Sequence, residues 1–375
     1  MKTKVYSDRR EKLYDWMTAE HIDMVMFEDF EGRRNPGIRW MTGNPADALL
    51  FLSAETRRSF LVPWDSNMAL TYCHAEVVYP YSDFDRDPIT ALYGAASVLK
   101  IPPGSRVEIP SVTSYTGFLK YVEEAGDYDI ICRNNGAYGE AENFRAVKDE
   151  EELLIYRKAA AITNELIDLL EEKVITGKLP TEIDVAQFIE AECRKRGCEG
   201  TGFETLAAGA ARSHYIHAFP SYTAEPFAGP GLSILDFGCK YQGYTTDVTL
   251  TFAKGPLNEA QETMLALTET AYAKALSMVK DGVSARKIGL AVDAIFRRAK
   301  KAMPHGLGHG IGLEAHEAPS LSSRKDNTDQ LRPGMLFTLE PGLYDARQGG
   351  CRLENDILLT EAGPEVLTRA RIIRF

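Results

Sequence analysis

The stretch that decides the fold is LDFGCKYQGYTTDVTLTF, residues 235–252. It has the composition of a buried β-hairpin, with apolar or aromatic residues on both sides of a central Gln-Gly pair. Each strand-like half nevertheless carries an aspartate, Asp236 and Asp247. Burying a lone carboxylate is costly unless the carboxylate is paired or bound to a cation. The stretch therefore predicts a buried site that must supply positive charge.

Hairpin geometry brings these acids together. In an antiparallel pair without a bulge, Asp236 and Asp247 would face each other on one side of the sheet, where two carboxylates repel. Residues 334–360, GMLFTLEPGLYDARQGGCRLENDILLT, repeat the pattern of strand, Gly-containing turn and strand. Here Glu340 and Glu354 can face each other. The sequence thus predicts that two hairpins each contribute a facing pair of carboxylates, four acids in all.

A divalent cation, or two, explains this arrangement better than separate pairing of each acid with arginine or lysine. Carboxylate oxygens are common ligands of divalent metals, and two metals that share bridging carboxylates need four or five such ligands. Five of the seven histidines lie near the same hairpins. They are His214, His217, His305, His309 and His316.

Three of these histidines lie in HGLGHGIGLEAHEAP, residues 305–319. The interleaved glycines let the backbone pass close to a ligand or to another strand, and their density opposes a helix. A zincin helix is therefore excluded. A phosphate-binding loop is excluded as well, because no Lys-Ser/Thr pair follows the glycines.

Length and composition agree with a two-domain globular enzyme. The chain has 375 residues, of which 44% are hydrophobic and 26% charged. Its net charge of −11 argues against a nucleic-acid binder. No apolar run approaches the length of a membrane helix and no secretory signal is visible, so we expect a cytoplasmic protein with reduced cysteines.

The order of the expected elements places a domain boundary before a long amphipathic helix at residues 148–173. Residues 1–146 alternate strand-like and helix-like segments, which indicates an α/β domain with a mixed sheet, and we expect Ser7 to cap its first helix. Residues 147–375 form the second predicted domain. Its further helices are expected near residues 181–196, 258–280 and 284–302.

These motifs resemble the pita-bread metallopeptidases, a family that includes methionine aminopeptidase, prolidase, aminopeptidase P and the related creatinase. Residues 150–375 resemble the catalytic domain, and the preceding residues resemble the N-terminal domain of prolidase, aminopeptidase P and creatinase. The resemblance implies an α/β N-terminal domain followed by an α+β pita-bread catalytic domain. It also implies a homodimer in which one subunit's front domain narrows access to the other's site.

The resemblance also assigns roles to residues. Asp236, Asp247, His309, Glu340 and Glu354 match the family's five metal ligands, which hold two divalent ions. Manganese or cobalt is expected, and zinc or iron fits the same ligands.

Other positions match residues that are not ligands. His217 and His316 match the two histidines that contact substrate, and Glu340 matches a ligand that also moves a proton. Arg352 matches an arginine that orients a ligand carboxylate.

The activity implied is metal-assisted hydrolysis of Xaa-Pro bonds in short proline-containing peptides, by a hydroxide that the two metals share. We favour an Xaa-Pro dipeptidase, a prolidase, with an Xaa-Pro aminopeptidase of the aminopeptidase P type as the alternative. The short spacing between Glu340 and Glu354 is similar to that of compact prolidases. However, Ser320 occupies the position where such prolidases often have an arginine for the substrate carboxylate, and the nearby Arg324 is a candidate substitute.

Other functional classes on this fold must be distinguished from the peptidase by experiment. A metal-dependent lyase on the same fold would keep all five ligands, so the ligands do not exclude it. Creatinase-type hydrolases and inactive binding proteins of this family lose ligands, and the intact set argues against both.

Overall fold

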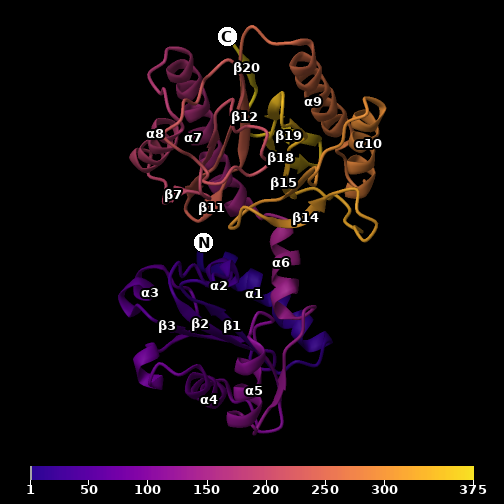
Figure 1. The fold of residues 1–375 in the computed structure, drawn as a ribbon. Helices are drawn as coiled ribbons and strands as arrows, with labels where there is room; N and C mark the ends of the chain where they lie inside the picture. The colour runs from indigo at the N-terminus through magenta and orange to yellow at the C-terminus, as the bar shows by residue number, and fades with distance from the viewer. Residues whose placement is uncertain (1) are drawn as a thin grey trace. The chain divides into compact units, whose positions relative to one another are not determined.

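The computed structural model describes residues 2–375, which divide into two compact units, Met1–Arg145 and Ala146–Phe375. The first unit is built on one mixed six-stranded sheet in the order β4-β3-β2-β1-β5-β6 (Figure 1). This mixed sheet agrees with the α/β domain expected for residues 1–146. The strands are β1 (Met24–Asp29), β2 (Ala48–Ser53), β3 (Arg58–Pro63), β4 (Val77–Val78), β5 (Arg106–Glu108) and β6 (Asp129–Ile131).

The first unit has more helices than the sequence predicted, and its first helix starts earlier than expected. The first helix begins at Lys2, so Ser7 lies inside it and the predicted cap at Ser7 is wrong. The short helices α2 and α3 begin at Asn35 and Asp65 caps, signals too local to be separated from ordinary turns. The helices are α1 (Lys2–Ala19), α2 (Pro36–Thr42), α3 (Ser66–Tyr72), α4 (Pro88–Leu99), α5 (Tyr115–Glu124) and α6 (Ala137–Ala146), with a 3₁₀ turn at Tyr81–Phe84.

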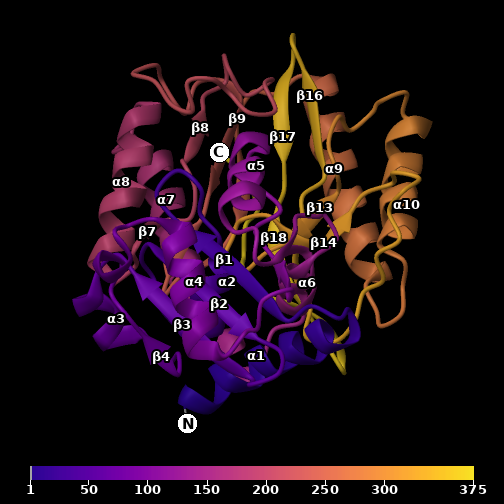
Figure 2. The same cartoon turned by 90° about the horizontal axis from the view of Figure 1, so that it is seen from below.

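The second unit repeats one arrangement twice: a pair of helices followed by a hairpin. Helices α7 (Glu150–Ile175) and α8 (Glu182–Lys195) precede β9 (Gly231–Phe237) and β12 (Val248–Lys254). Helices α9 (Glu259–Met278) and α10 (Ala285–Arg298) precede the second hairpin region. The two helix pairs lie on opposite sides of the strands in both views (Figures 1 and 2).

Two extended sheets carry this unit. One has the order β20-β12-β9-β8, and the other has the order β14-β13-β15-β18-β19. Each helix pair shares a hydrophobic core with one of the acid-bearing hairpin regions. The remaining strands are β7 (Gly200–Thr201), β8 (Leu206–Ala208), β10 (Cys239–Tyr241), β11 (Tyr244–Thr245), β13 (Gly308–Gly310), β14 (Glu317–Leu321), β15 (Leu336–Leu339), β16 (Gly342–Asp345), β17 (Gly349–Arg352), β18 (Asn355–Thr360), β19 (Gly363–Val366) and β20 (Ile372–Arg374).

The register of the first hairpin differs from the expected one. Asp236 pairs with Thr249 rather than facing Asp247. The turn is displaced because Gln242 and Gly243 both have positive φ, 48° and 89°, as in the tight turns that suit right-twisted hairpins. The displacement moves the partner of Asp236 by two residues, from Asp247 to Thr249. Side chains along a strand point to alternate faces of the sheet with a period of two. Both acids therefore remain on the same face of the sheet.

The register of the second hairpin agrees with the expected one. Leu339 pairs with Asn355 and Gly342 pairs with Arg352. Glu340 and Glu354 occupy the facing positions between these two ladders.

Glycines in the histidine-rich segment permit close backbone contact, as predicted. A Cβ on Gly308 would lie 2.1 Å from the carbonyl oxygen of Thr338, and one on Gly310 would lie 1.9 Å from that of Ala318. Strand β13 fits between β14 and β15 for this reason. The segment is extended rather than helical, so His309 projects from a strand in the middle of a sheet.

Among the described residues, no helix has both the length and the apolar character required to cross a membrane.

The helix α7 offers a matched test of core packing. Leu166 is fully buried, whereas Leu154 on the same helix is 71% exposed. We expect Leu166→Ala to lower the free energy of unfolding by about 3 kcal/mol, because it leaves a cavity between α7 and the first hairpin. Leu154→Ala should change it by less than about 0.5 kcal/mol. Urea unfolding followed by circular dichroism measures both, and equal losses would contradict the assigned core.

Candidate active site

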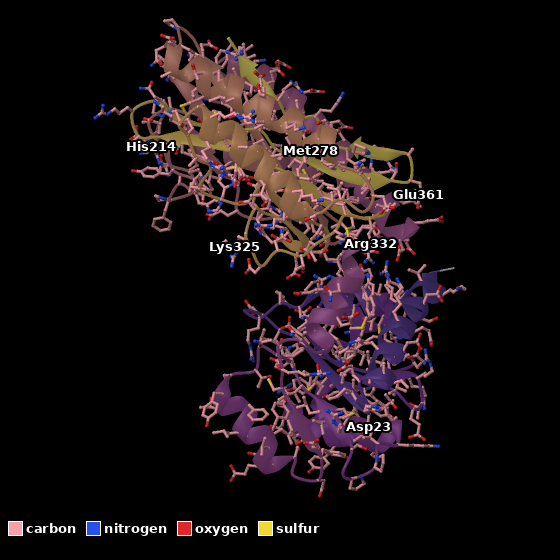
Figure 3. All side chains as sticks on the ribbon, turned by 90° about the vertical axis from the view of Figure 1, so that its right-hand side faces the viewer. Asp23, His214, Met278, Lys325, Arg332 and Glu361 are labelled. Atoms are coloured by element: carbon pink, nitrogen blue, oxygen red, sulfur yellow. The ribbon has the colours of Figure 1, made fainter. Side chains whose placement is uncertain are left out.

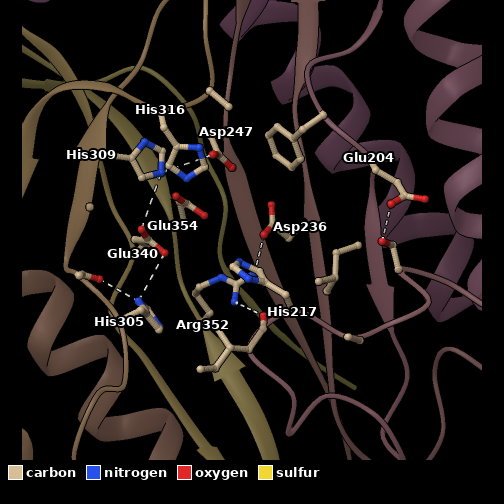
Figure 4. Close-up of a pocket in the computed structure, with 18 residues that line it drawn as sticks. Glu204, His217, Asp236, Asp247, His305, His309, His316, Glu340, Arg352 and Glu354 are labelled. Atoms are coloured by element: carbon tan, nitrogen blue, oxygen red, sulfur yellow. Dashed lines mark hydrogen bonds and ion pairs between the residues drawn. The ribbon is translucent and has the colours of Figure 1, made fainter. Parts of the chain in front are cut away.

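One pocket of about 560 Å³ in the second unit contains every site residue expected from the sequence (Figure 4). The elements that converge on it come from both hairpin regions, from β13 and from the loop before β9. The expected residues that line it are His217, Asp236, Asp247, His309, His316, Glu340, Arg352 and Glu354.

The four acids occupy the ends of strands. Asp236 lies on β9 and Asp247 directly precedes β12. Glu340 directly follows β15 and Glu354 directly precedes β18. Because strands are rigid and held on both sides, the four carboxylates have little freedom to move apart.

The donor set fits divalent cations. The ligand atoms of Asp247, His309 and Glu354 all lie within 4.8 Å of one another. His309 Nε2 is 3.7 Å from Asp247 Oδ2 and 3.7 Å from Glu340 Oε1. Three buried carboxylate oxygens have no hydrogen-bond partner: Asp236 Oδ1, Asp247 Oδ1 and Glu354 Oε1. Unpaired buried acceptors of this kind are costly, and cation binding removes the cost.

Electrostatics agree with that geometry. Burial raises the pKa values of Asp247 and Glu340 well above their usual range, and the Glu354 carboxylate raises them further. Burial also raises the pKa of Glu354 to about 7, and Asp236 adds to the shift. Burial and then His316 lower the pKa of His309 to about 4. The imidazole of His309 is therefore neutral near pH 7, which is the form that binds a metal.

Arg352 is the only arginine or lysine that lines the pocket within residues 2–375. It is 2% exposed, and one of its N–H groups donates to the Ile216 carbonyl oxygen at 3.2 Å. It donates to Asp236 Oδ2, to the Tyr344 hydroxyl at 2.7 Å and to Thr249 Oγ1 at 2.9 Å. Arg352 therefore orients the Asp236 carboxylate, and its charge counteracts part of the rise in the pKa values of Glu340 and Glu354.

Thr249 connects the two halves of the site. Its carbonyl oxygen accepts from the Glu354 backbone N–H at 3.2 Å, and its hydroxyl donates to Glu354 Oε2 at 2.7 Å. The second oxygen of Glu354 is left for a ligand. Behind the first hairpin, the backbone N–H of Asp247 donates to the buried Asp356 carboxylate at 3.3 Å. Sequence reasoning missed Thr249 and Asp356, because neither belongs to a recognisable motif.

The five clustered histidines do not all reach the pocket. His217, His305, His309 and His316 line it, whereas His214 packs against the Tyr215 ring, with centroids 4.1 Å apart. The expectation that His214 supports the site is therefore wrong. His214 lies three residues before His217 on a loop, and a loop has no regular period that predicts where a side chain points.

His305 is a site residue to which the sequence assigned no role. Its Nε2 lies 3.0 Å from the Tyr344 hydroxyl, and its Nδ1 lies 3.6 Å from Glu340 Oε2. Burial and then Arg352 lower the pKa of His305 to about 4, so the imidazole is neutral near pH 7. The spacing in HGLGHG, residues 305–310, could have indicated this role, because the alternate glycines place His305 and His309 on one extended segment.

The loop that carries His217 is held by a buried acid. Glu182, at the first position of α8, is 0% exposed. Its carboxylate accepts from the Gly209 N–H at 2.8 Å, from the Thr223 N–H at 2.8 Å and from Arg212. These contacts join both ends of the loop that contains His217. Glu182 was not predicted, because nothing in its local sequence distinguishes it from other acids in a first helical turn.

Ser320 and Arg324 lie outside this pocket. Ser320 pairs with His309 across β13 and β14, and its side chain faces a separate surface hollow that Arg324 also lines. Arg324 is paired with Asp326 at 3.1 Å. The same surface loop carries Lys325, which points away from the fold (Figure 3). Arg324 is therefore not placed to take the role of a carboxylate anchor.

Comparison with known families agrees with this site. The model of the family described as metallopeptidase family M24 matches residues 155–361, more than half of the chain. This chain belongs to metallopeptidase family M24. The match includes all five expected ligands.

Relatives of the M24 chain include proline-specific enzymes. An Xaa-Pro dipeptidase from Pyrococcus horikoshii is 33% identical over 233 residues, which are 60% of this chain and 64% of that protein. The sequence alignment thus spans less than two thirds of that relative.

Solved structures extend the likeness over nearly the whole chain. The prolidase from Pyrococcus horikoshii OT3 has a TM-score of 0.83 at 26% identity and covers 97% of this chain and 98% of its own. The X-Pro aminopeptidase from Thermotoga maritima MSB8 has a TM-score of 0.79 at 26% identity, and the match covers 94% of this chain and 98% of the aminopeptidase. The predicted fold, an α/β N-terminal domain followed by a pita-bread catalytic domain, is confirmed.

The role of Glu182 can be tested by stability. Glu182→Ala should lower the free energy of unfolding by about 3 kcal/mol, because it leaves a half-buried arginine and buried N–H groups unpaired. It should also speed proteolytic cleavage within residues 209–226. Glu225→Ala is the matched control, since Glu225 is an exposed acid of the same loop. Urea unfolding and limited proteolysis with mass spectrometry measure both effects, and identical behaviour of the two variants would refute the assigned role.

Proposed function

We propose that this M24 chain is a dinuclear-metal peptidase that hydrolyses Xaa-Pro bonds, with Xaa-Pro dipeptidase as the first assignment. The observation that carries the proposal is the set of three unpaired, buried carboxylate oxygens, from Asp236, Asp247 and Glu354, in one pocket. The names of the sequence relative and of the structural neighbours support Xaa-Pro peptides as the substrate class.

The proposed metal ligands are those expected from the sequence. Asp236, Asp247, His309, Glu340 and Glu354 would hold two divalent ions, with manganese or cobalt as the first candidates. Such ions, when bound, acidify water and polarise a carbonyl oxygen. A neutral His309 among carboxylates provides the nitrogen and oxygen donors that suit these metals.

Side chains of the pocket would transfer protons, bind the carbonyl oxygen and orient a carboxylate. Glu340 would take the proton of the attacking water and pass it to the leaving proline nitrogen, as a positioned carboxylate can. His217 and His316 reach the pocket from the loop before β9 and from the segment before β14. They would donate hydrogen bonds to the carbonyl oxygen as it gains charge and assist the leaving group. Arg352 would keep Asp236 oriented.

One observation favours the aminopeptidase alternative. A dipeptidase must hold the free carboxylate of its substrate, and an arginine is well suited to bind it. Arg352, the only arginine or lysine of residues 2–375 that lines the pocket, is committed to Asp236 and Tyr344. An aminopeptidase that acts on longer peptides has no such requirement.

A cytoplasmic homodimer belongs to the same proposal. Sedimentation velocity of the full chain measures the mass, and cell fractionation measures the location. A monomer at micromolar concentration would contradict the assembly.

The activity is tested with two substrates and one metal control. We expect chelator-treated protein to be inactive and added Mn²⁺ to restore proline release from Leu-Pro. Leucine release from Leu-Pro-Gly is measured in parallel. Cleavage of the tripeptide alone would indicate an aminopeptidase. Failure on both substrates with two metals bound would refute the peptidase and favour a metal-dependent lyase.

Two substitutions separate ligands from other site residues. Asp247→Ala should abolish turnover and lower the metal content with a retained circular dichroism spectrum, because it removes a proposed ligand. His316→Ala should keep both metals and lower kcat by about 100-fold, as loss of a positioned proton donor does. Inductively coupled plasma mass spectrometry measures the metals. Metal loss in His316→Ala would show that the wrong histidine is assigned as a ligand.

A further inference from the structure

The pocket has a second acidic feature that the proposed chemistry does not use. Glu204 lies in the segment between β7 and β8 and lines the pocket on the side away from His309 and Glu340 (Figure 4). One of its oxygens, Oε2, accepts from the Ser221 hydroxyl at 2.7 Å. The wall around it is apolar and consists of Phe203, Leu206, Ile216 and Ala218.

Glu204 differs from the buried acids in its surroundings. It is exposed, whereas Asp247 and Glu354 are buried. Among residues 4–375, no lysine, arginine or histidine forms an ion pair with it. A solvated carboxylate needs no metal to be stable, so Glu204 is available to a cation that enters the pocket.

We infer that Glu204 selects a basic side chain, lysine or arginine, on the residue before proline. The inference rests on the proposed function and adds the preferred substrate to it. Proline has no ionisable side chain, and a carboxylate repels the negatively charged end of a dipeptide. In an Xaa-Pro dipeptide, only the first residue can therefore bring a cation to Glu204.

The side chain, rather than the α-ammonium group, fits this position. The α-ammonium is attached to the carbon beside the scissile carbonyl, so catalysis holds it near the buried acids. Glu204 lies across the pocket from Glu340 and His309, with Asp236 between them in the close-up (Figure 4). A lysine stem would cover the apolar wall formed by Phe203 and Leu206 while its ammonium reaches the Glu204 carboxylate and solvent.

The test compares Lys-Pro with norleucyl-proline, which has a similar stem without the charge. In the Mn²⁺-loaded full chain at low salt, kcat/KM should be about fivefold higher for Lys-Pro, as expected for an exposed charge pair. The preference should shrink in 0.5 M NaCl because salt screens it. E204Q should reduce the ratio to about one. The matched control E225Q removes an exposed acid that does not line the pocket and should keep the wild-type ratio.

The outcomes distinguish the inference from the function on which it rests. Equal kcat/KM values for both dipeptides in the wild type would overturn the inference while leaving an Xaa-Pro peptidase. An equal loss on both dipeptides in E204Q would assign Glu204 to the α-ammonium and overturn the side-chain preference. If neither dipeptide is cleaved, the proposed function fails and the inference fails with it.

Discussion

Mutual repulsion among four carboxylates in one buried pocket is the constraint on which the rest of the catalytic unit depends. Asp236, Asp247, Glu340 and Glu354 come from two hairpin regions that would be more stable apart if charge alone decided. Arg352 neutralises part of this charge through Asp236. Unpaired oxygens remain on three of the acids, and burial raises the pKa values of Asp247, Glu340 and Glu354, so ionising these groups together is costly unless a cation binds.

The architecture supplies the force that keeps these acids together. Each hairpin region packs against its own helix pair through a continuous apolar core. Hydrophobic burial on both sides therefore offsets the electrostatic cost at the centre. Thr249 joins the halves through two hydrogen bonds to Glu354, one from the backbone and one from the side chain. Rigid strands and this cross-connection hold the four carboxylates in place before any ion binds.

Expectations from the sequence succeeded where structure is local. The alternation of residues along strands placed Asp236 and Asp247 on one face, although the turn at Gln242 shifted their register by two positions. The facing positions of Glu340 and Glu354 followed from the same reasoning. Expectations failed for His214, because a loop has no period that fixes where a side chain points. They also failed for Ser7, which lies within a helix that starts earlier.

By itself, the sequence determined the two-domain fold class and the convergence of Asp236, Asp247, Glu340 and Glu354, because strand periodicity and motif spacing are local properties. Tertiary structure decided the rest. It held the His217 loop on Glu182, brought His305 to Tyr344, kept Arg324 on the surface and placed Glu204 in the pocket wall. These contacts join segments far apart in the chain, and no local pattern records which distant segment a side chain will meet.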